Sequence, residues 1–188
     1  MESYRKFIAI FILILMMSAV VTLPARGEER KPGEYEVKAV FLYNLAKFIE
    51  WPHKSPDSSP TLTFYILGDD PFGNNLDAIK GKLIKGEKIT VKHIDSLNAL
   101  KNVGVLFISS SEKEQLEDLL KGISGRPILT VGDTQSFAKR GVMINFYIEN
   151  SKIRFEINME AVKLAGLKIS SNLLKMGKII DSPVGQGK

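Results

Sequence analysis

Cysteine is absent from the chain, which has 188 residues. The protein therefore has no disulfide to stabilise its fold and no thiol that could serve as nucleophile or redox switch. Histidine is almost absent too, with only His53 and His93. No histidine or carboxylate pair has the spacing of a zinc site, and there is no G-x-S-x-G sequence. We therefore predict no catalytic residues and no bound metal ion, with a weak hard-cation site at Asp69 and Asp70 as the open alternative.

Nucleotide-binding motifs are also missing, because the chain contains neither G-x-G-x-x-G nor a P-loop. Residues 1–27 hold three basic residues and one acidic residue, which leaves 23 basic against 20 acidic residues in the rest, a net charge of +3. The lysines and arginines form no run and are rarely interleaved with aromatic residues. We therefore expect neither a cofactor nor a nucleic-acid partner, and we expect the protein not to be an enzyme.

The N-terminus has the pattern of an export signal. Arg5 and Lys6 precede the apolar run Phe7–Val21, and Ala25-Arg26-Gly27 offers a small-x-small cleavage site. We predict a cleaved signal peptide over residues 1–27; an uncleaved anchor is the alternative. Because no cysteine follows the apolar run, the chain is not predicted to be a lipoprotein. Residues 28–188 are long enough for one domain of ordinary globular composition, 44% hydrophobic and 25% charged.

The first part of this predicted domain alternates between helical and extended patterns. Apolar residues recur at helical spacing before Pro52, namely Val37, Val40, Phe41, Leu45, Phe48 and Ile49. Strands are expected at Leu62–Leu67, Ile89–Ile94, Val103–Ile108 and Ile128–Val131. Helices are expected at Asn74–Ile84 and Ser111–Leu120, with a helical turn at Ser96–Leu100. This order predicts an α/β sandwich with a mostly parallel central sheet flanked by helices.

The last part of the domain begins with a hairpin. Met143–Ile148 and Lys152–Ile157 both alternate with period two, and a polar turn at residues 149–151 separates them. Asn158 can cap a helix as far as Ala165, which Gly166 ends, and Ser170 or Ser171 can cap a second, closing helix. The antiparallel hairpin and the closing C-terminal helices are expected to extend the sheet at one edge.

A small-molecule site is predicted where the parallel strands end, because ligands bind beyond their carboxyl ends. The polar residues there are Asp69, Asp70, Ser109 and Asp133, and Tyr43 or Trp51 is proposed as a stacking wall. The alternative is that these residues close turns and cap helices, for which Asp and Ser are equally suited. Trp51 in particular fits a core position at the end of the first helix.

Three stretches together resemble the YfiR family of periplasmic proteins: EYEVKAVFLYNLAKFIEWP, ILGDDPFG and GVMINFYIENSKIRFEINMEAVKLAGLKISSNLLKM. The resemblance covers about Glu34–Ile180. It implies an α/β sandwich, a homodimer and a soluble periplasmic repressor. Such a repressor binds the periplasmic sensor domain of an inner-membrane diguanylate cyclase, which lowers cyclic di-GMP synthesis and biofilm formation; a lipoprotein of the outer membrane can sequester it. A sensor kinase is an alternative membrane partner. Because this chain lacks cysteine, the redox control of some relatives cannot operate here.

For this role we expect a contact surface on the hairpin and the closing helices, formed by Phe146, Glu156, Ile169, Leu173 and Leu174. Glu156 has an alternative explanation, a salt bridge across the strands. The competing function is a periplasmic small-molecule binding protein without a cyclase partner, which would use the site at the strand ends.

Overall fold

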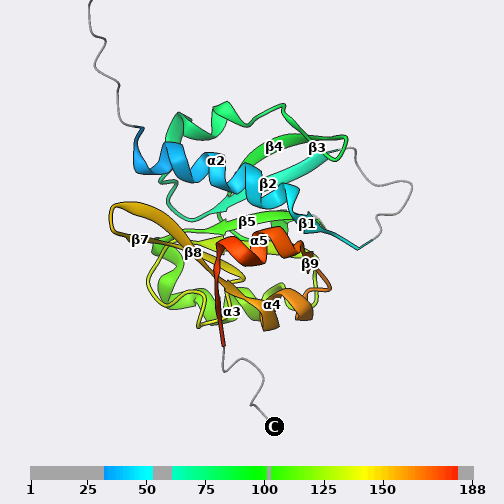
Figure 1. The fold of residues 1–188 in the computed structure, drawn as a ribbon. Helices are drawn as coiled ribbons and strands as arrows, with labels where there is room; N and C mark the ends of the chain where they lie inside the picture. The colour runs from blue at the N-terminus through cyan, green and yellow to red at the C-terminus, as the bar shows by residue number, and fades with distance from the viewer. Residues whose placement is uncertain (1–31, 53–60, 101–102, 182–188) are drawn as a thin grey trace, which may run out of the picture. The chain divides into compact units, whose positions relative to one another are not determined.

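The computed structural model describes residues 32–52, 61–100 and 103–181 (Figure 1). The expected signal peptide, residues 1–27, lies outside this part of the chain. Among the described residues, no helix has the length and apolar character needed to cross a lipid bilayer. The first described element is α2, the helix Glu34–Lys47.

An eight-stranded sheet lies at the centre of the fold, in the order β10-β8-β7-β6-β5-β2-β4-β3. Its strands are β2 (Thr61–Leu67), β3 (Leu83–Ile84), β4 (Glu87–Ile94), β5 (Gly104–Ile108), β6 (Ile128–Gly132), β7 (Ile144–Glu149), β8 (Lys152–Asn158) and β10 (Lys178–Ile180). The five strands that are adjacent in the order β4-β2-β5-β6-β7 are parallel to one another. The strand β8 is antiparallel to β7, and β3 is antiparallel to β4. The predicted mostly parallel sheet with an antiparallel hairpin beyond it is confirmed.

Helices cover both faces of the sheet, as the apolar strands require (Figure 1). Successive side chains of β2 alternate between two apolar clusters: Phe64 and Ile66 belong to the cluster that contains residues of α2, and Tyr65 and Leu67 to the cluster on the side of α3 (Leu116–Gly122). All four side chains are at most 1% exposed. The predicted flanking of the sheet by helices is therefore confirmed.

The helix α2 buries only part of the strip that its spacing predicts, with Leu45 and Ile49 in the core as expected. The buried residues are Lys38, Ala39, Leu42, Leu45 and Ala46. Val40, which was expected on the buried face, is 48% exposed. A second apolar strip of α2 is only partly covered: Phe41 packs on Phe146 and Phe155 of the hairpin, and Val40 stays exposed.

The hairpin β7–β8 forms in the predicted place. Phe146 lies opposite Phe155 in the register, and the turn between the strands has Asn150 and Ser151 at positive φ. Asn158 caps α4 (Met159–Leu164) by accepting a hydrogen bond from the backbone N–H of Ala161 at 3.0 Å. The hairpin and the helix cap could be predicted from the sequence because both depend on interactions between residues close in the chain.

The closing segment after α4 is more elaborate than expected. Ser170 caps α5 (Ser171–Met176), as predicted, and accepts a hydrogen bond from Leu173 N. Before α5, β9 (Lys168–Ile169) pairs with β1 (Ile49–Glu50) in a separate two-stranded sheet. After α5, β10 adds a last parallel strand beside β8. The short strands β1, β9 and β10 leave no alternating pattern long enough to detect.

The helix expected over Asn74–Ile84 is wrong. This segment contains a 3-10 helix, η1 (Gly73–Ala78), and then the edge strand β3. Lys85 and Gly86 both have positive φ, as a two-residue type I′ hairpin turn requires, and they join β3 to β4. The other helical segments are short: η2 (Leu97–Ala99) lies within the expected turn, and η3 (Ser110–Gln115) precedes α3.

Candidate functional site

The amino-terminal half of α2 is attached to the sheet by buried charges at the end of β6. Lys38 Nζ lies 2.6 Å from Asp133 Oδ2, and Tyr35 Oη donates to the same oxygen at 2.9 Å. The Lys38 side chain is 4% exposed and that of Asp133 8%, and Glu34 pairs with Lys38 from the solvent side. Burial and the adjacent Asp133 carboxylate raise the pKa of Tyr35 above its usual range. Asp133, which we predicted as a ligand-binding residue, thus uses its Oδ2 to bind Lys38 and Tyr35 of the same chain.

The other polar residues at the strand ends also make internal contacts. Asp70 accepts from the backbone N–H of Phe72 at 2.8 Å, and its second oxygen lies 2.9 Å from His93 Nε2. The backbone N–H of Asp69 donates to Ser111 Oγ at 3.0 Å. Ser109 is 3% exposed and precedes η3. These contacts are those of turns and helix starts, and no group of three or more potential acidic or histidine metal ligands occurs among the described residues.

Tyr43 and Trp51 lie near the amino-terminal end of β4, and not at the carboxyl ends of the parallel strands. Tyr43 Oη is 3.4 Å from the carbonyl oxygen of Leu83, in the hairpin at the amino-terminal end of β4. Trp51 follows β1, whose Ile49 carbonyl accepts from Lys85 Nζ in the same hairpin. The structure therefore does not bring these aromatic rings to the carboxyl ends where Asp133 lies, so the proposed site is not assembled as one pocket.

A mainly apolar groove lies where α2, β8 and α5 meet, with a volume of about 620 Å³. Phe41 of α2 forms its centre, packed edge-on against Phe155 with ring centroids 6.4 Å apart. Val40 and Met176 line it from the two helices and are 48% and 54% exposed. Arg154 and Lys175 supply positive charge at its border. The exposed apolar strip of α2 is one wall of this groove.

The residues predicted for a contact surface are only partly on this surface. Phe146 and Leu173 are each 1% exposed and belong to the core, so their assignment to an exposed surface is corrected; Leu173 contributes to the floor of the groove. Phe146 and Glu156 also point to opposite faces of the hairpin, because Phe146 is opposite Phe155. Ile169 in β9 and Leu174 in α5 are partly buried against the core.

Glu156 makes a cross-strand contact. Its Oε1 is 3.6 Å from Nζ of Lys178, its register partner on β10, and its side chain is 18% exposed. This is the salt-bridge alternative that the sequence left open. The contact links the hairpin to the last strand of the sheet, so Glu156 supports the surface without facing the groove.

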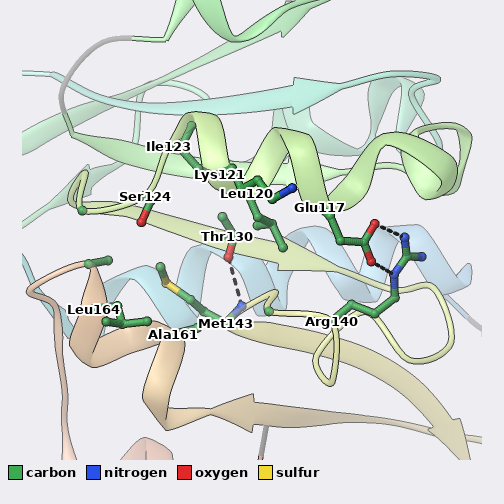
Figure 2. A pocket seen from close by; sticks show the side chains of 13 residues that line it. Glu117, Leu120, Lys121, Ile123, Ser124, Thr130, Arg140, Met143, Ala161 and Leu164 are labelled. Atoms are coloured by element: carbon green, nitrogen blue, oxygen red, sulfur yellow. Dashed lines mark hydrogen bonds and ion pairs between the residues drawn. The ribbon is translucent and has the colours of Figure 1, made fainter. Parts of the chain in front are cut away.

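A second hollow, about 360 Å³ in volume, is lined by α3, α4, the strand β6 and the segment that precedes β7 (Figure 2). The backbone ladder from β6 to β7 starts at Val131, and one residue earlier the Thr130 hydroxyl accepts from Met143 N at 2.9 Å. At the mouth, Arg140 donates to both Glu117 oxygens at 2.7 Å (Figure 2). These bonds lower the pKa of Glu117 to about 2. The charges at this mouth are therefore already matched.

A protein-family comparison decides the relationship. The chain matches a family described as YfiR/HmsC-like over residues 35–178. The chain belongs to the YfiR/HmsC-like family. The matched region runs from the first turn of α2 to the first residue of β10 and contains the groove, the second hollow and the ion pair between Lys38 and Asp133.

Sequence reasoning missed several features of this YfiR/HmsC-like chain. Val40 was recognised as an apolar helix residue but not as an exposed one, and the exposure of Met176 was not predicted. The ion pair between Glu117 and Arg140 joins residues far apart in the sequence, so no local pattern indicates it. One signal for the groove was present: α2 has apolar residues around more than one face, and a helix needs only one such face to pack on a sheet.

Proposed function

We propose that this chain is a periplasmic regulator that binds the periplasmic domain of an inner-membrane diguanylate cyclase and represses cyclic di-GMP synthesis. Membership in the YfiR/HmsC-like family supports a periplasmic regulator of this signalling system that interacts with a membrane protein. The family consists of regulators and not of catalysts, which agrees with our sequence-based expectation that the protein is not an enzyme. The partner, the direction of its response and a homodimer remain predictions from resemblance.

The observation that carries the proposal is the partly exposed apolar strip of α2 along the groove. A helix that packs on a sheet with one face normally presents polar residues on the other. Here the second face carries Val37, Val40 and Phe41, all of which line the groove. Exposed apolar surface that is contiguous and bordered by charged residues marks sites of protein association. We place the cyclase contact at this groove.

The groove also favours a particular kind of partner. Its apolar floor is bordered by Arg154 and Lys175, whose charges are available for acidic side chains of a bound segment. Arg154 has one weak contact, to Glu149 at 3.9 Å, with both side chains more than half exposed. An amphipathic helix with apolar anchors and flanking acidic residues satisfies both features.

Repression requires unequal affinity for two states of the cyclase. A regulator that binds the active and inactive states equally well shifts nothing, whatever its affinity. The regulator must therefore use the groove to hold an arrangement of the sensor domain that occurs in the inactive cyclase. The rigid contact between α2 and the sheet, through Lys38 and Asp133, suits this task because it fixes one wall of the groove.

The first experiment measures binding of the purified mature chain to the periplasmic domain of the candidate cyclase by calorimetry. Met176→Glu and Val40→Glu should each weaken binding at least about tenfold, because each places a charge in an apolar contact. Leu164→Glu is the matched control: Leu164 is 59% exposed and lies on α4, outside the groove. Intracellular cyclic di-GMP should rise in the two groove variants and stay at the wild-type level in the control.

Two results would contradict the proposal. Equal affinity of Met176→Glu, Val40→Glu and wild type, with all three proteins folded, removes the groove from the interface. Absence of any binding to a cyclase domain, together with capture of a sensor kinase by crosslinking in cells, replaces the cyclase as partner. The same crosslinking reports whether an outer-membrane lipoprotein and a second copy of the chain are bound.

A further inference from the structure

Four lysines lie at one edge of the sheet, three in or beside the β3–β4 hairpin and one at the end of α2. They are Lys47, Lys82, Lys85 and Lys88, and we call this surface the lysine face. Two of the ammonium groups share one aromatic ring: Lys47 Nζ is 3.9 Å and Lys82 Nζ 5.3 Å from the ring centroid of Tyr43. Residues 80–92 alone contain five lysines and one glutamate. Most of this positive charge therefore comes from one short stretch, and the fold adds Lys47 to it.

None of these four lysines is in an ion pair with a described residue, in contrast to Lys38, Lys80, Lys121 and Lys178. Lys47 donates to the Asn44 side chain at 3.1 Å, and Lys85 donates to the Ile49 carbonyl at 2.8 Å; both acceptors are neutral. Glu50 and Glu87 are the acidic residues of the neighbouring strands β1 and β4, and they are fewer than the lysines. An excess of positive charge therefore remains for an anionic partner.

Leu83 lies between Lys82 and Lys85 and is 61% exposed. Its register partner on β4 is Lys88, so an apolar and a cationic side chain lie side by side on the face of the hairpin that points away from Ile84 and α2. Lys82 lies on the other face, at the Tyr43 ring, so the edge hairpin carries cations on both faces. Lysines on an edge strand protect it from pairing with another strand, but an exposed leucine does not serve that purpose. Apolar and cationic side chains together are suited to the interface of an anionic lipid bilayer.

The shape of the hairpin is compatible with contact at a flat surface. β3 is the edge strand of the sheet, and the Lys85–Gly86 turn ends the hairpin in two residues (Figure 1). The opposite side of β3 is anchored, because Ile84 is 3% exposed in the core. Docking would therefore not require the hairpin to unfold.

We propose that the lysine face docks the protein onto anionic phospholipid headgroups, with Leu83 entering the headgroup region. This inference does not depend on which protein binds the groove. It goes beyond the proposed function, because it predicts that the regulator concentrates on the membrane surface by itself. Each basic residue near an anionic membrane contributes a comparable increment of binding, so the four lysines act together.

The test is cosedimentation of the mature full chain with vesicles of phosphatidylcholine, with and without phosphatidylglycerol. We expect binding only to vesicles that contain phosphatidylglycerol, and we expect it to weaken as salt screens the charges. Lys82→Glu/Lys88→Glu should lower the partition coefficient at least about tenfold. Leu83→Ser should lower it by a smaller factor, about threefold, that changes little with salt. All three positions are exposed, so folding should be retained.

The matched control is Lys152→Glu/Lys163→Glu, which makes the same change in net charge at exposed positions on β8 and α4. It should bind like wild type. An equal loss in the control overturns the proposal, because it shows attraction by net charge only. Absence of binding to either vesicle overturns it as well. If no vesicle binding is seen, but wild type binds an acidic protein domain and Lys82→Glu/Lys88→Glu does not, the lysine face is a protein-binding surface instead.

Discussion

The two ends of α2 carry the same pair of residue types and use them differently. At the amino-terminal end Lys38 Nζ lies 4.4 Å from the Tyr35 ring centroid, and at the carboxyl-terminal end Lys47 Nζ lies 3.9 Å from that of Tyr43. Within the described part of the chain, only the first pair has a buried carboxylate within reach, that of Asp133. The aromatic contact therefore does not decide whether a lysine is structural; the carboxylate does.

The difference follows from the cost of removing a charge from water. An ammonium group that is almost wholly buried needs a partner charge and hydrogen bonds, since without them desolvation costs several kcal/mol. Lys38 has both, whereas Lys47 stays exposed and needs neither. One end of α2 is thereby fixed to the sheet, and the other presents charge to the surroundings.

The largest effect is expected when the buried end is broken. Lys38→Met leaves the Asp133 carboxylate buried without its counter-charge and should lower the free energy of unfolding by about 3 kcal/mol. For a chain of this size that corresponds to a fall of the melting temperature by about 10 °C. Urea unfolding and thermal melts measure both quantities.

A double variant separates charge from packing at this end. Lys38→Met/Asp133→Leu removes both charges and should recover at least half of the loss, because well-packed apolar pairs can replace buried ion pairs. Equal stability of Lys38→Met and Lys47→Met would show that the buried charges do not distinguish the two ends of the helix.

A smaller loss of stability is expected when an exposed ion pair is broken. Comparison with Lys38 shows whether burial or the number of hydrogen bonds determines the loss. Arg140 makes two bonds to Glu117, but the Glu117 side chain is 53% exposed. Arg140→Gln should therefore cost about 1 kcal/mol or less at neutral pH. The pKa of Glu117 is lowered from 4.5 to about 2, so the stabilisation is present above pH 4.5 and is lost as the pH falls towards 2.

The measurement for this pair is the free energy of unfolding of wild type and Arg140→Gln as a function of pH. The two curves should converge between pH 4.5 and 2. Parallel curves throughout that interval would mean that Arg140 stabilises the fold by its packing on Phe137 and not by its charge.

The smallest effect is expected at the exposed end of α2. Lys47→Met and Lys82→Met should each change the free energy of unfolding by less than about 0.5 kcal/mol. The double variant should be slightly more stable than wild type at low salt, since two like charges at one Tyr43 ring are removed. Added salt should abolish this gain. A loss of more than about 1 kcal/mol would contradict the assignment of these lysines to the surface.

Features that depend on near neighbours could be predicted from the sequence. The alternation in residues 143–157 specified the hairpin, and Asn158 and Ser170 specified the helix starts. The order of strands and helices was sufficient for the mostly parallel sheet. Each of these inferences uses contacts within a few residues or a general rule for connecting elements.

Features that depend on distant residues could not be predicted. The spacing in α2 shows two apolar strips, and only the position of the sheet decides which of them is buried. Lys38 was not considered for the core because its partner Asp133 lies at the end of another element. The same holds for the candidate site: Phe146 has the pattern of a half-buried hairpin, but Phe41 of α2 covers it, with ring centroids 5.9 Å apart.

The groove also constrains when the protein can work. Phe41 and Phe155 meet across it although they belong to the beginning and the end of the folded chain, and α5 completes its wall only near the C-terminus. When the chain is synthesised from its amino-terminal end, the apolar strip of α2 is therefore made long before α5, which completes the groove. Contacts between such distant segments are slow to form because a long loop must close first. We therefore expect a shortened chain that lacks α5 to expose the apolar strip of α2 and to lack the groove that we propose for partner binding.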